Sequence, residues 1–129
     1  MAPGLKKVLQ SGFEDALVRV PEALKAEGFG VLTEIDVTDT LKKKLNVDFR
    51  RYRILGACNP PLAHQALEAS LDVGLMLPCN VIVYEADDGR AVVSAADPTQ
   101  TLAAQQDPRI RGVAEVVRAK LKQVLARLA

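Results

Sequence analysis

Residues 79–95 read CNVIVYEADDGRAVVSA, and their pattern indicates the centre of a β-sheet. The segment Cys79–Ala86 is apolar on both faces through its centre, which is typical of a central strand in a sheet. Asp88-Gly89 is the strongest hairpin signal in the chain, and we expect a type I′ turn with Gly89 at positive φ. Arg90–Ala95 returns as the partner strand, so the pattern predicts an antiparallel hairpin at the centre of the molecule.

Further strands are predicted upstream of this hairpin. Leu5–Gln10 forms a short first strand, and Gly30–Val37 alternates apolar side chains with Glu34 and Asp36 on a polar face. Phe49–Ala57 reads as another strand, which ends in an apolar run. Together with the hairpin, these segments supply the strands of one sheet.

Capping residues mark where the predicted helices begin and end. Ser11 and Glu14 have the spacing of a capping box, and Gly28 is placed to end that helix in a left-handed conformation. Asn59, followed by two prolines, is a strong start for a second helix, because proline suits the first helical turn. Asp107 before Pro108 starts a helix in the same way.

The helix that begins at Pro108 is long and amphipathic. Its apolar side chains recur at spacings of three and four residues: Ile110, Val113, Val117, Leu121, Val124 and Leu128. This stripe packs on the sheet or on a partner subunit. The order of elements predicts an α+β fold, with helices packed on a mostly antiparallel or mixed sheet in a two-layer arrangement.

Length and composition limit the classes of protein. The chain has 129 residues, 49% of them hydrophobic and 26% charged, so we expect a single globular domain over residues 1–129. Aromatic residues make up only 4%, so the core is mostly aliphatic. A net charge of +1 gives no global field to attract nucleic acid. No signal peptide or membrane-spanning stretch is visible, and we expect a soluble, cytoplasmic protein.

The best chemical candidate is the junction Cys58-Asn59-Pro60. A cysteine that precedes a helix N-terminus faces unpaired N–H groups and the positive end of the helix dipole, which lower the pKa of a thiol. Cys79 starts the central strand after Pro78, so both thiols lie at one edge of the sheet if their strands are neighbours. The alternative is that both cysteines are small, inert parts of the core.

His64 is the only histidine of the chain. With Cys58 it would make a pair for nucleophilic catalysis, and with both cysteines it would supply three ligands for a soft metal. The spacing matches no established metal-site pattern, however. Because neighbouring apolar residues take the core face of the helix, we expect His64 to point into solvent.

Residues 42–53 include six basic side chains: Lys42, Lys43, Lys44, Arg50, Arg51 and Arg53. A nucleic-acid-binding stripe and a site for a small anion are two interpretations of this segment. The third is structural, because Glu34 and Asp36 on the preceding strand can pair with Arg51 or Arg53 across the sheet. We favour this structural interpretation.

Several motifs together resemble a known family. Leu55-Gly56-Ala57-Cys58-Asn59-Pro60 and the later Leu77-Pro78-Cys79-Asn80 look like the paired CNP and LPC signatures of domain-of-unknown-function family three hundred and two. The similarity covers roughly residues 11 to 100 and includes the Gly28-Phe29 turn and the Asp97-Pro98 step. It implies a small bacterial or archaeal α+β domain, without an activity, substrate or cofactor to carry over.

The two signatures define the candidate site as Cys58, Asn59, Pro60, Pro78 and Cys79. Our first hypothesis is a homodimeric module that binds a small ligand or a soft metal at this site, without strong catalytic activity. The second is a thiol enzyme or redox protein, in which Cys58 is the attacking thiolate and Cys79 its resolving partner. The third is a structural or protein-binding module whose cysteines are inert. The cofactor is unknown from sequence, and neither nucleic acid nor a membrane is an expected partner.

Overall fold

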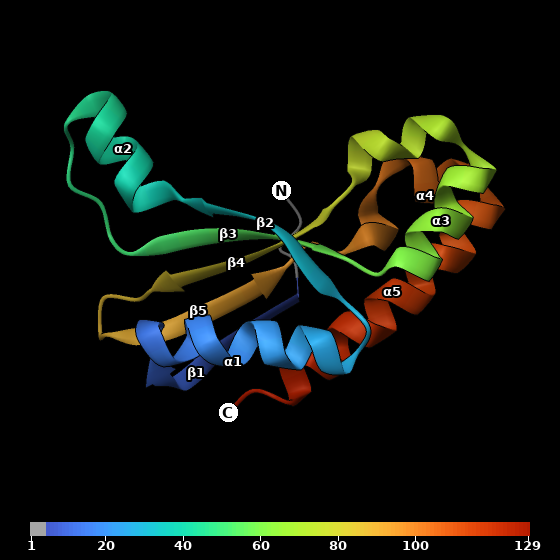
Figure 1. Ribbon diagram of the computed structural model, residues 1–129. Helices are drawn as coiled ribbons and strands as arrows, with labels where there is room; N and C mark the ends of the chain where they lie inside the picture. Colours follow the sequence, from blue (N-terminus) through green and yellow to red (C-terminus); the bar gives the residue numbers. More distant parts are fainter. Residues whose placement is uncertain (1–4) are drawn as a thin grey trace.

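The computed structural model describes residues 5–129 and shows a five-stranded antiparallel sheet with strand order β1-β5-β4-β3-β2 (Figure 1). The predicted α+β class is therefore confirmed, and the sheet is antiparallel throughout the described residues. The strands are β1 (Leu5–Gly12), β2 (Gly30–Asp36), β3 (Tyr52–Cys58), β4 (Cys79–Glu85) and β5 (Arg90–Ala95). As the apolar centre of residues 79–86 predicts, β4 lies in the middle of the sheet.

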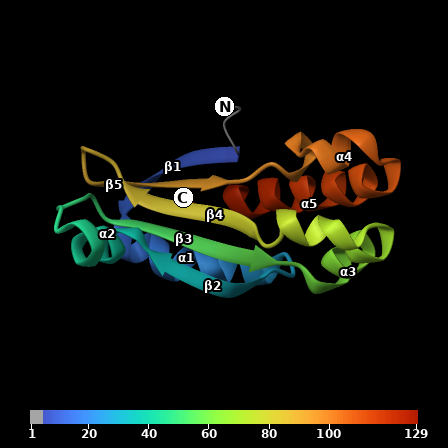
Figure 2. The ribbon, with the colours of Figure 1, turned by 90° about the horizontal axis from the view of Figure 1, so that it is seen from above.

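The helices lie on one face of the sheet and at both of its ends. They are α1 (Phe13–Ala26), α2 (Val37–Leu45), α3 (Pro60–Ala69), α4 (Leu102–Gln106) and α5 (Pro108–Ala126), with two 3₁₀ segments, η1 (Leu71–Met76) and η2 (Pro98–Gln100). Figure 1 shows α1 beneath the sheet, α3, α4 and most of α5 beyond one end, and α2 beyond the other. Seen from above, the opposite face of the sheet carries no helix (Figure 2).

The main core lies between the sheet and the helices α1 and α5. Leu9, Leu24, Leu55, Val93 and Leu121 are all at most 1% exposed and belong to one cluster. The apolar stripe of α5 is therefore used within the fold, where it contacts the sheet and α1. The core is mostly aliphatic, as the low aromatic content of the sequence predicts. Burial of these apolar side chains contributes the largest favourable term to the stability of the fold.

The hairpin between β4 and β5 differs from the predicted turn type. Gly89 has φ +86°, but Asp88 does not have positive φ, so the turn is not type I′. Instead, the N–H of Gly89 donates to the carbonyl of Ala86 at 3.0 Å, and the N–H of Ala86 donates to the carbonyl of Arg90 at 2.8 Å. This pattern is a type I turn followed by a left-handed glycine bulge, which fits a loop one residue longer than expected.

The start of α1 also differs from its prediction. Gly12 is the N-cap and makes no side-chain capping bond, so Ser11 and Glu14 do not form a capping box. The strand β1 continues through Ser11 because its pairing with β5 resumes at Gly12, opposite Arg90, after a register shift. Glu14 instead forms an ion pair with Arg51, in which the Arg51 Nη1 lies 2.6 Å from the Glu14 Oε1.

Strand β1 also secures the end of α5. The Nζ of Lys7 donates to the carbonyl oxygen of Leu125 at 3.0 Å and to that of Leu128. The N–H of Gln10 donates to the carbonyl oxygen of Ala129 at 3.0 Å. A lysine at a helix C-terminus satisfies carbonyls that have no partner in the helix and lies at the negative end of its dipole. The first strand and the last helix are thereby joined.

Candidate functional site

The junction between β3 and α3 is built around Asn59. Its Oδ1 accepts a hydrogen bond from the N–H of Leu62 at 3.4 Å, which makes it the N-cap that the sequence predicts. Its Nδ2 donates to the carbonyl oxygen of Glu27 at 3.3 Å, in the turn that ends α1. Among the described residues, Asn59 is the only buried polar one. Both ends of its amide are used to hold the fold together.

A pocket of about 380 Å³ opens beside this junction. This volume lies within the range of pockets that hold small molecules. Its walls are mostly apolar and come from α3, η1 and α5, with Leu62, Ala66, Val73, Met76, Ile110 and Val117 among the lining residues. Its polar lining consists of Cys58, Asn59, Cys79, Asn80, Asp97 and Thr101.

Three of these polar groups are already engaged by the protein itself. Besides Asn59, the Asp97 carboxylate accepts from the Thr99 N–H at 3.0 Å and from Arg118 Nε at 2.8 Å. The Thr101 hydroxyl accepts from the N–H of Ala104 at 3.2 Å. These groups shape the wall and leave little capacity for a ligand.

The groups that remain available are the two thiols and one amide. Both cysteines are free and half-buried. Within residues 5–129, the side chain of Asn80 makes no hydrogen bond and is exposed. The site therefore offers an apolar chamber with two soft sulfur atoms and a single amide at its wall.

Strand register sets the relation between the two cysteines. Ala57, and not Cys58, is the partner of Cys79 in the ladder between β3 and β4. Because successive residues of a strand point to opposite faces, this register does not place the two thiols side by side as a cross-strand pair. They form no disulfide. The strands β3 and β4 are neighbours, which is the condition that the sequence prediction set, but the two thiols do not form a direct pair.

Burial raises the pKa of the Cys79 thiol, and the charge of an ionised Cys58 raises it further. The neutral thiol is thus the favoured form of Cys79 in the folded protein. This property counts against Cys79 as a thiolate and favours its role as part of an apolar wall.

Gly56 allows β3, β2 and the segment before β4 to approach closely. A Cβ built at this position would lie 2.2 Å from the Thr33 Oγ1 and 2.8 Å from the Pro78 Cγ. Pro78 follows a cis peptide bond from Leu77 and lines the pocket. The glycine of the first signature therefore sets the position of the proline of the second. Pro60, the remaining candidate, begins α3 and does not line the pocket.

His64 points away from these residues, as predicted. Its side chain is 73% exposed, and its Nε2 lies 3.0 Å from the Oε1 of Glu68, one turn along α3. It does not line the pocket. Within residues 5–129, no group of three or more His, Cys, Asp or Glu side chains is placed to hold a metal ion. The three-ligand site that combines His64 with both cysteines is therefore not formed.

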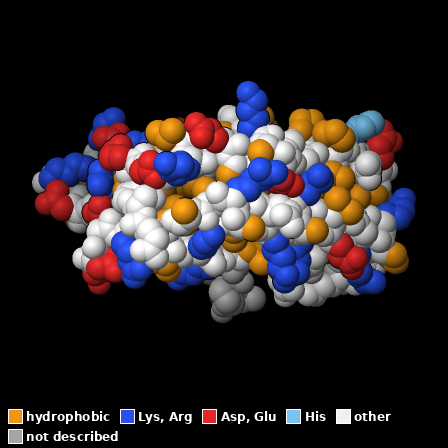
Figure 3. Space-filling model, turned by 90° about the horizontal axis from the view of Figure 1, so that it is seen from below, with side chains coloured by type: hydrophobic (Ala, Val, Ile, Leu, Met, Phe, Trp, Pro, Cys, Tyr) orange, Lys and Arg blue, Asp and Glu red, His pale blue; other side chains and the backbone are white. Residues whose placement is uncertain are grey.

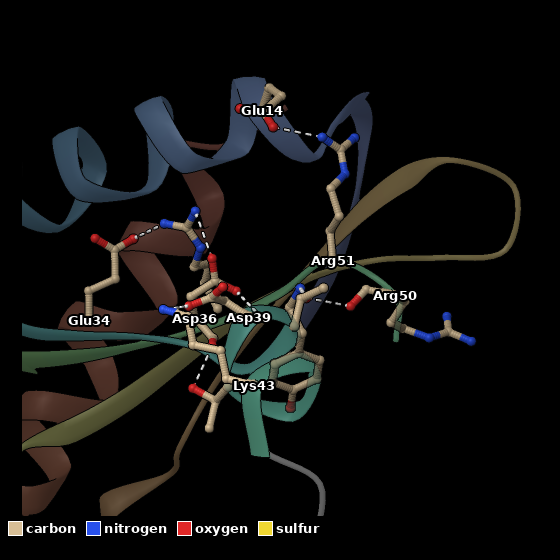
Figure 4. Close-up of polar contacts among 11 residues, drawn as sticks. Glu14, Glu34, Asp36, Asp39, Lys43, Arg50 and Arg51 are labelled. Atoms are coloured by element: carbon tan, nitrogen blue, oxygen red, sulfur yellow. Dashed lines mark hydrogen bonds and ion pairs between the residues drawn. The ribbon is translucent and has the colours of Figure 1, made fainter. Parts of the chain in front are cut away.

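The basic segment is ion-paired at the opposite end of the sheet (Figure 4). Arg53 contacts Glu34 at 2.9 Å and Asp36 at 3.3 Å, which is the cross-strand pairing that the sequence suggests. Arg51 joins α1 to β4 by contacting Glu14 and Glu85, and its guanidinium lies 4.9 Å from the centre of the Phe13 ring. The remaining pairs are Arg50 with Asp87, Lys42 with Asp48, and Lys43 with Asp39.

These pairs support the structural interpretation of the basic segment. Lys44 alone of its six cations has no ion pair within residues 5–129. On the face that carries α1, Lys and Arg side chains are interspersed with Asp and Glu and do not gather into one patch (Figure 3). A nucleic-acid surface requires unpaired, clustered cations.

Comparison with known proteins identifies the family. The family described as "Domain of unknown function DUF302" matches residues 5–128. The chain belongs to the DUF302 family. The match extends the resemblance seen in the sequence, which covered roughly residues 11 to 100, to nearly the whole chain.

A solved DUF302 structure has the same fold. It is the crystal structure of an uncharacterized conserved DUF302 protein from Bacillus stearothermophilus, with 32% identity, full coverage of both chains and a TM-score of 0.90. No curated protein matches the chain. Among residues 5–129, none of the helices combines the length and apolar character needed to cross a membrane.

Sequence reasoning missed most of the pocket wall. The signatures locate both thiols, but α5, which lines another side of the chamber, is far from them in sequence. The segment η1 directly precedes the second signature, but it carries no motif of its own. The available signals were the apolar run around Val73 and the stripe of α5, and each also fits ordinary core packing. Asp97 and its partner Arg118 were not predicted as a pair, because nothing local links them.

Proposed function

We propose that this DUF302 domain binds a small, largely apolar molecule in the pocket beside Cys58 and Cys79. The single observation that supports the proposal is the pocket itself: about 380 Å³, walled by aliphatic side chains, with both signature cysteines in its lining. An apolar chamber with few polar groups selects ligands by shape and by desolvation. The free thiols and the Asn80 amide orient the ligand.

A soft metal ion is the second candidate for the same place. It is favoured by the two thiols in one lining, because thiolates select soft ions such as Cu(I). A metal would have to displace the proton that the raised pKa of Cys79 holds on that thiol. A two-sulfur site also lacks the third and fourth ligands of a structural zinc site.

We also propose that the domain acts as a homodimer. Support comes from large apolar side chains that the fold leaves in solvent outside the pocket, including Ile35 at 49% exposed and Phe49 at 46%. Contiguous exposed apolar surface commonly marks an interface.

The ligand proposal is tested with N-phenyl-1-naphthylamine, an uncharged and apolar fluorescent probe. Ala63 lines the pocket, so Ala63→Leu fills part of the chamber, whereas Ala119→Leu adds the same volume on an exposed position of α5 outside it. We expect Ala63→Leu to weaken probe binding at least tenfold and Ala119→Leu to leave it unchanged. Equal binding by both variants would contradict the proposal.

The metal candidate has a separate readout. Cu(I) binding is titrated for the unmodified protein, Cys58→Ser and Cys79→Ser, with bound metal measured on the same preparations. A stoichiometric ion that either serine abolishes would favour the metal. Retention of the probe by both serine variants, with no stoichiometric ion, would favour the apolar ligand.

A further inference from the structure

The uncovered face of the sheet carries two apolar rows that run across the strands. Alternation places these residues opposite the core, because Leu55, Val83 and Val93 point into the cluster beneath α1 and α5. The first row runs through Ile35, Ile54, Ile82, Ser94 and Lys6, which are successive partners across all five strands. The second runs through Tyr52, Tyr84, Val92 and Val8.

These rows are continuous and nearly free of charge. Tyr52 and Tyr84 stack with ring centroids 5.4 Å apart. At the edges of the face, Ile35 and Val8 are 49% and 43% exposed, whereas Val92 between the neighbouring side chains is 4% exposed. The central members of the rows are half-buried: Tyr52, Ile54, Ile82, Tyr84 and Ser94. Lys6 is the only charged member of the rows, and it lies on the edge strand β1. Seen from above, this face lies open between α2 at one end and α3 at the other (Figure 2).

The arm formed by α2 and the loop after it, residues 37–51, is also left uncovered by the rest of the fold. None of the residues of α2 is buried, although it ends in a left-handed Asn46 cap and is well formed. Leu45, Val47 and Phe49 are 65%, 43% and 46% exposed. Figure 1 shows α2 beyond one end of the strands, on the side of the sheet opposite α1. A helix with no buried residue gains most of its stability from a surface that covers it.

We infer that a second copy of this chain covers the uncovered face, sheet against sheet. This inference rests on the proposed homodimer and gives its interface. The same apolar rows on both copies are self-complementary, as a two-fold interface requires, and the single cation at the rim brings no unpaired charge to its centre. Two sheets packed in this way lie about 10 Å apart with interdigitating side chains.

The area also points to the arm as part of the interface. Five strands at about 4.8 Å spacing, over about six residues, give a flat face of about 500 Å². A standard interface buries about 800 Å² on each partner. The sheet face alone therefore falls short, and the apolar residues of the α2 arm supply the remainder by packing on the partner.

Sedimentation velocity over a wide range of protein concentrations tests the inference. We expect the unmodified protein to be a dimer, and Ile82→Lys, in the centre of the rows, to be monomeric. Ile35→Lys places the same charge at a more exposed position of the face, so it tests the interface with less risk to folding. Phe49→Lys tests the arm. Val18→Lys, on a position of α1 that is 61% exposed, is the matched control and should stay dimeric.

The outcomes separate this inference from the rest of the proposed function. Thermal melts establish that each variant is folded. A dimer that persists in Ile82→Lys and Ile35→Lys would overturn the interface and leave the homodimer intact. An unmodified protein that is monomeric at all concentrations would overturn both. If such a monomer bound phosphatidylcholine vesicles and Ile35→Lys abolished that binding, the face would belong to a lipid surface.

Discussion

The side-chain amide of Asn59 joins the start of α3 to the carbonyl oxygen of Glu27 at the end of α1, with Nδ2 and O 3.3 Å apart. A cap usually stabilises its own helix, but this one also fixes a second element 32 residues away. Gly28 makes room for it, because a Cβ there would lie 3.0 Å from Asn59 Nδ2. Asn59 thus holds α1 and α3 together as well as lining the pocket.

Asn59→Ala should lower the free energy of unfolding by about 2–4 kcal/mol. The cap contributes about 1 kcal/mol, and leaving the part-buried carbonyl of Glu27 without its hydrogen bond costs about 1–3 kcal/mol. Asn59→Asp is the matched control, because aspartate caps a helix equally well but cannot donate to Glu27. Urea denaturation should rank the three proteins as unmodified, Asp and Ala. An alanine variant as stable as the unmodified protein would show that the two hydrogen bonds of the Asn59 side chain do not stabilise the fold.

Gly56→Ala should destabilise the protein by about 1–3 kcal/mol, because the new methyl group overlaps Thr33 and Pro78. Adding Thr33→Ala removes the Oγ1 that lies 2.2 Å from the new Cβ, so the double variant should recover part of the loss. Chemical denaturation of all four members of this cycle measures the coupling. Additive effects of the two substitutions would speak against direct contact.

Gly89→Val should lower the melting temperature, because a β-branched residue at φ +86° is strained by about 1–2 kcal/mol. Gly89→Asn tolerates the left-handed conformation and should be affected less. A Cβ at this position meets no atom within 4 Å, so the effect isolates backbone strain from crowding. Equal melting temperatures for Gly89→Val and Gly89→Asn would show that the turn accommodates a β-branched residue at positive φ without a penalty.

Alkylation of Cys79 by iodoacetamide should require a higher pH than an ordinary thiol, whose pKa is about 8.5, because burial and the charge of Cys58 raise its pKa. Cys58→Ser removes the second cause and leaves the larger one. Its labelling profile should therefore move to lower pH without reaching the ordinary value. Labelling of Cys79 in the folded protein at the pH of a free thiol would contradict this prediction.

The same group links stability to alkaline pH. The folded state favours the neutral thiol, so its contribution is fully present below the ordinary thiol pKa and is lost as pH rises through the raised pKa of Cys79. Urea midpoints measured above pH 8.5 should fall more steeply for the unmodified protein than for Cys79→Ala, which has no thiol to ionise.

Asp97 gives the opposite dependence at acid pH. Burial raises the pKa of its carboxyl, but hydrogen bonds from Thr99 and Arg118 outweigh that effect and lower the pKa overall. The stability from this carboxylate is therefore present above the ordinary pKa of about 3.9 and is lost as pH falls through the lowered value. Asp97→Asn should be less stable at neutral pH and lose less on acidification. Parallel pH profiles for the two proteins would contradict this account.

The sequence predicts what is local. Cap-and-proline pairs at Asn59 and Asp107 locate the starts of α3 and α5, and the apolar centre of residues 79–86 locates the central strand. The type of turn is harder to predict from the sequence, because Asp88-Gly89 fits both a two-residue and a three-residue loop. The hydrogen bond from the Ala86 N–H to the Arg90 carbonyl shows that the loop has three residues. Ser11 illustrates how sheet pairing overrides a capping signal.

The candidate site was predictable only in part. Its cysteines stand out because Cys79 directly follows Pro78 and Cys58 lies two residues before Pro60, each at a strand end. The chamber itself depends on how α5 and η1 pack against α3, which no spacing reveals. The exclusion of His64 was predictable, since the apolar residues of its helix occupy the buried side.

The bonds between Lys7 and the end of α5 have a consequence for the order of folding. Lys7 finds its acceptor 118 residues later, and Leu5 pairs with Ala95 on β5. During synthesis, the first strand leaves the ribosome long before either partner exists, whereas the β4–β5 hairpin closes as soon as it is made. Contacts so distant in sequence close late and slow the search. The edge strand β1 therefore pairs last among the strands of the sheet, because its partner β5 is complete only at Ala95.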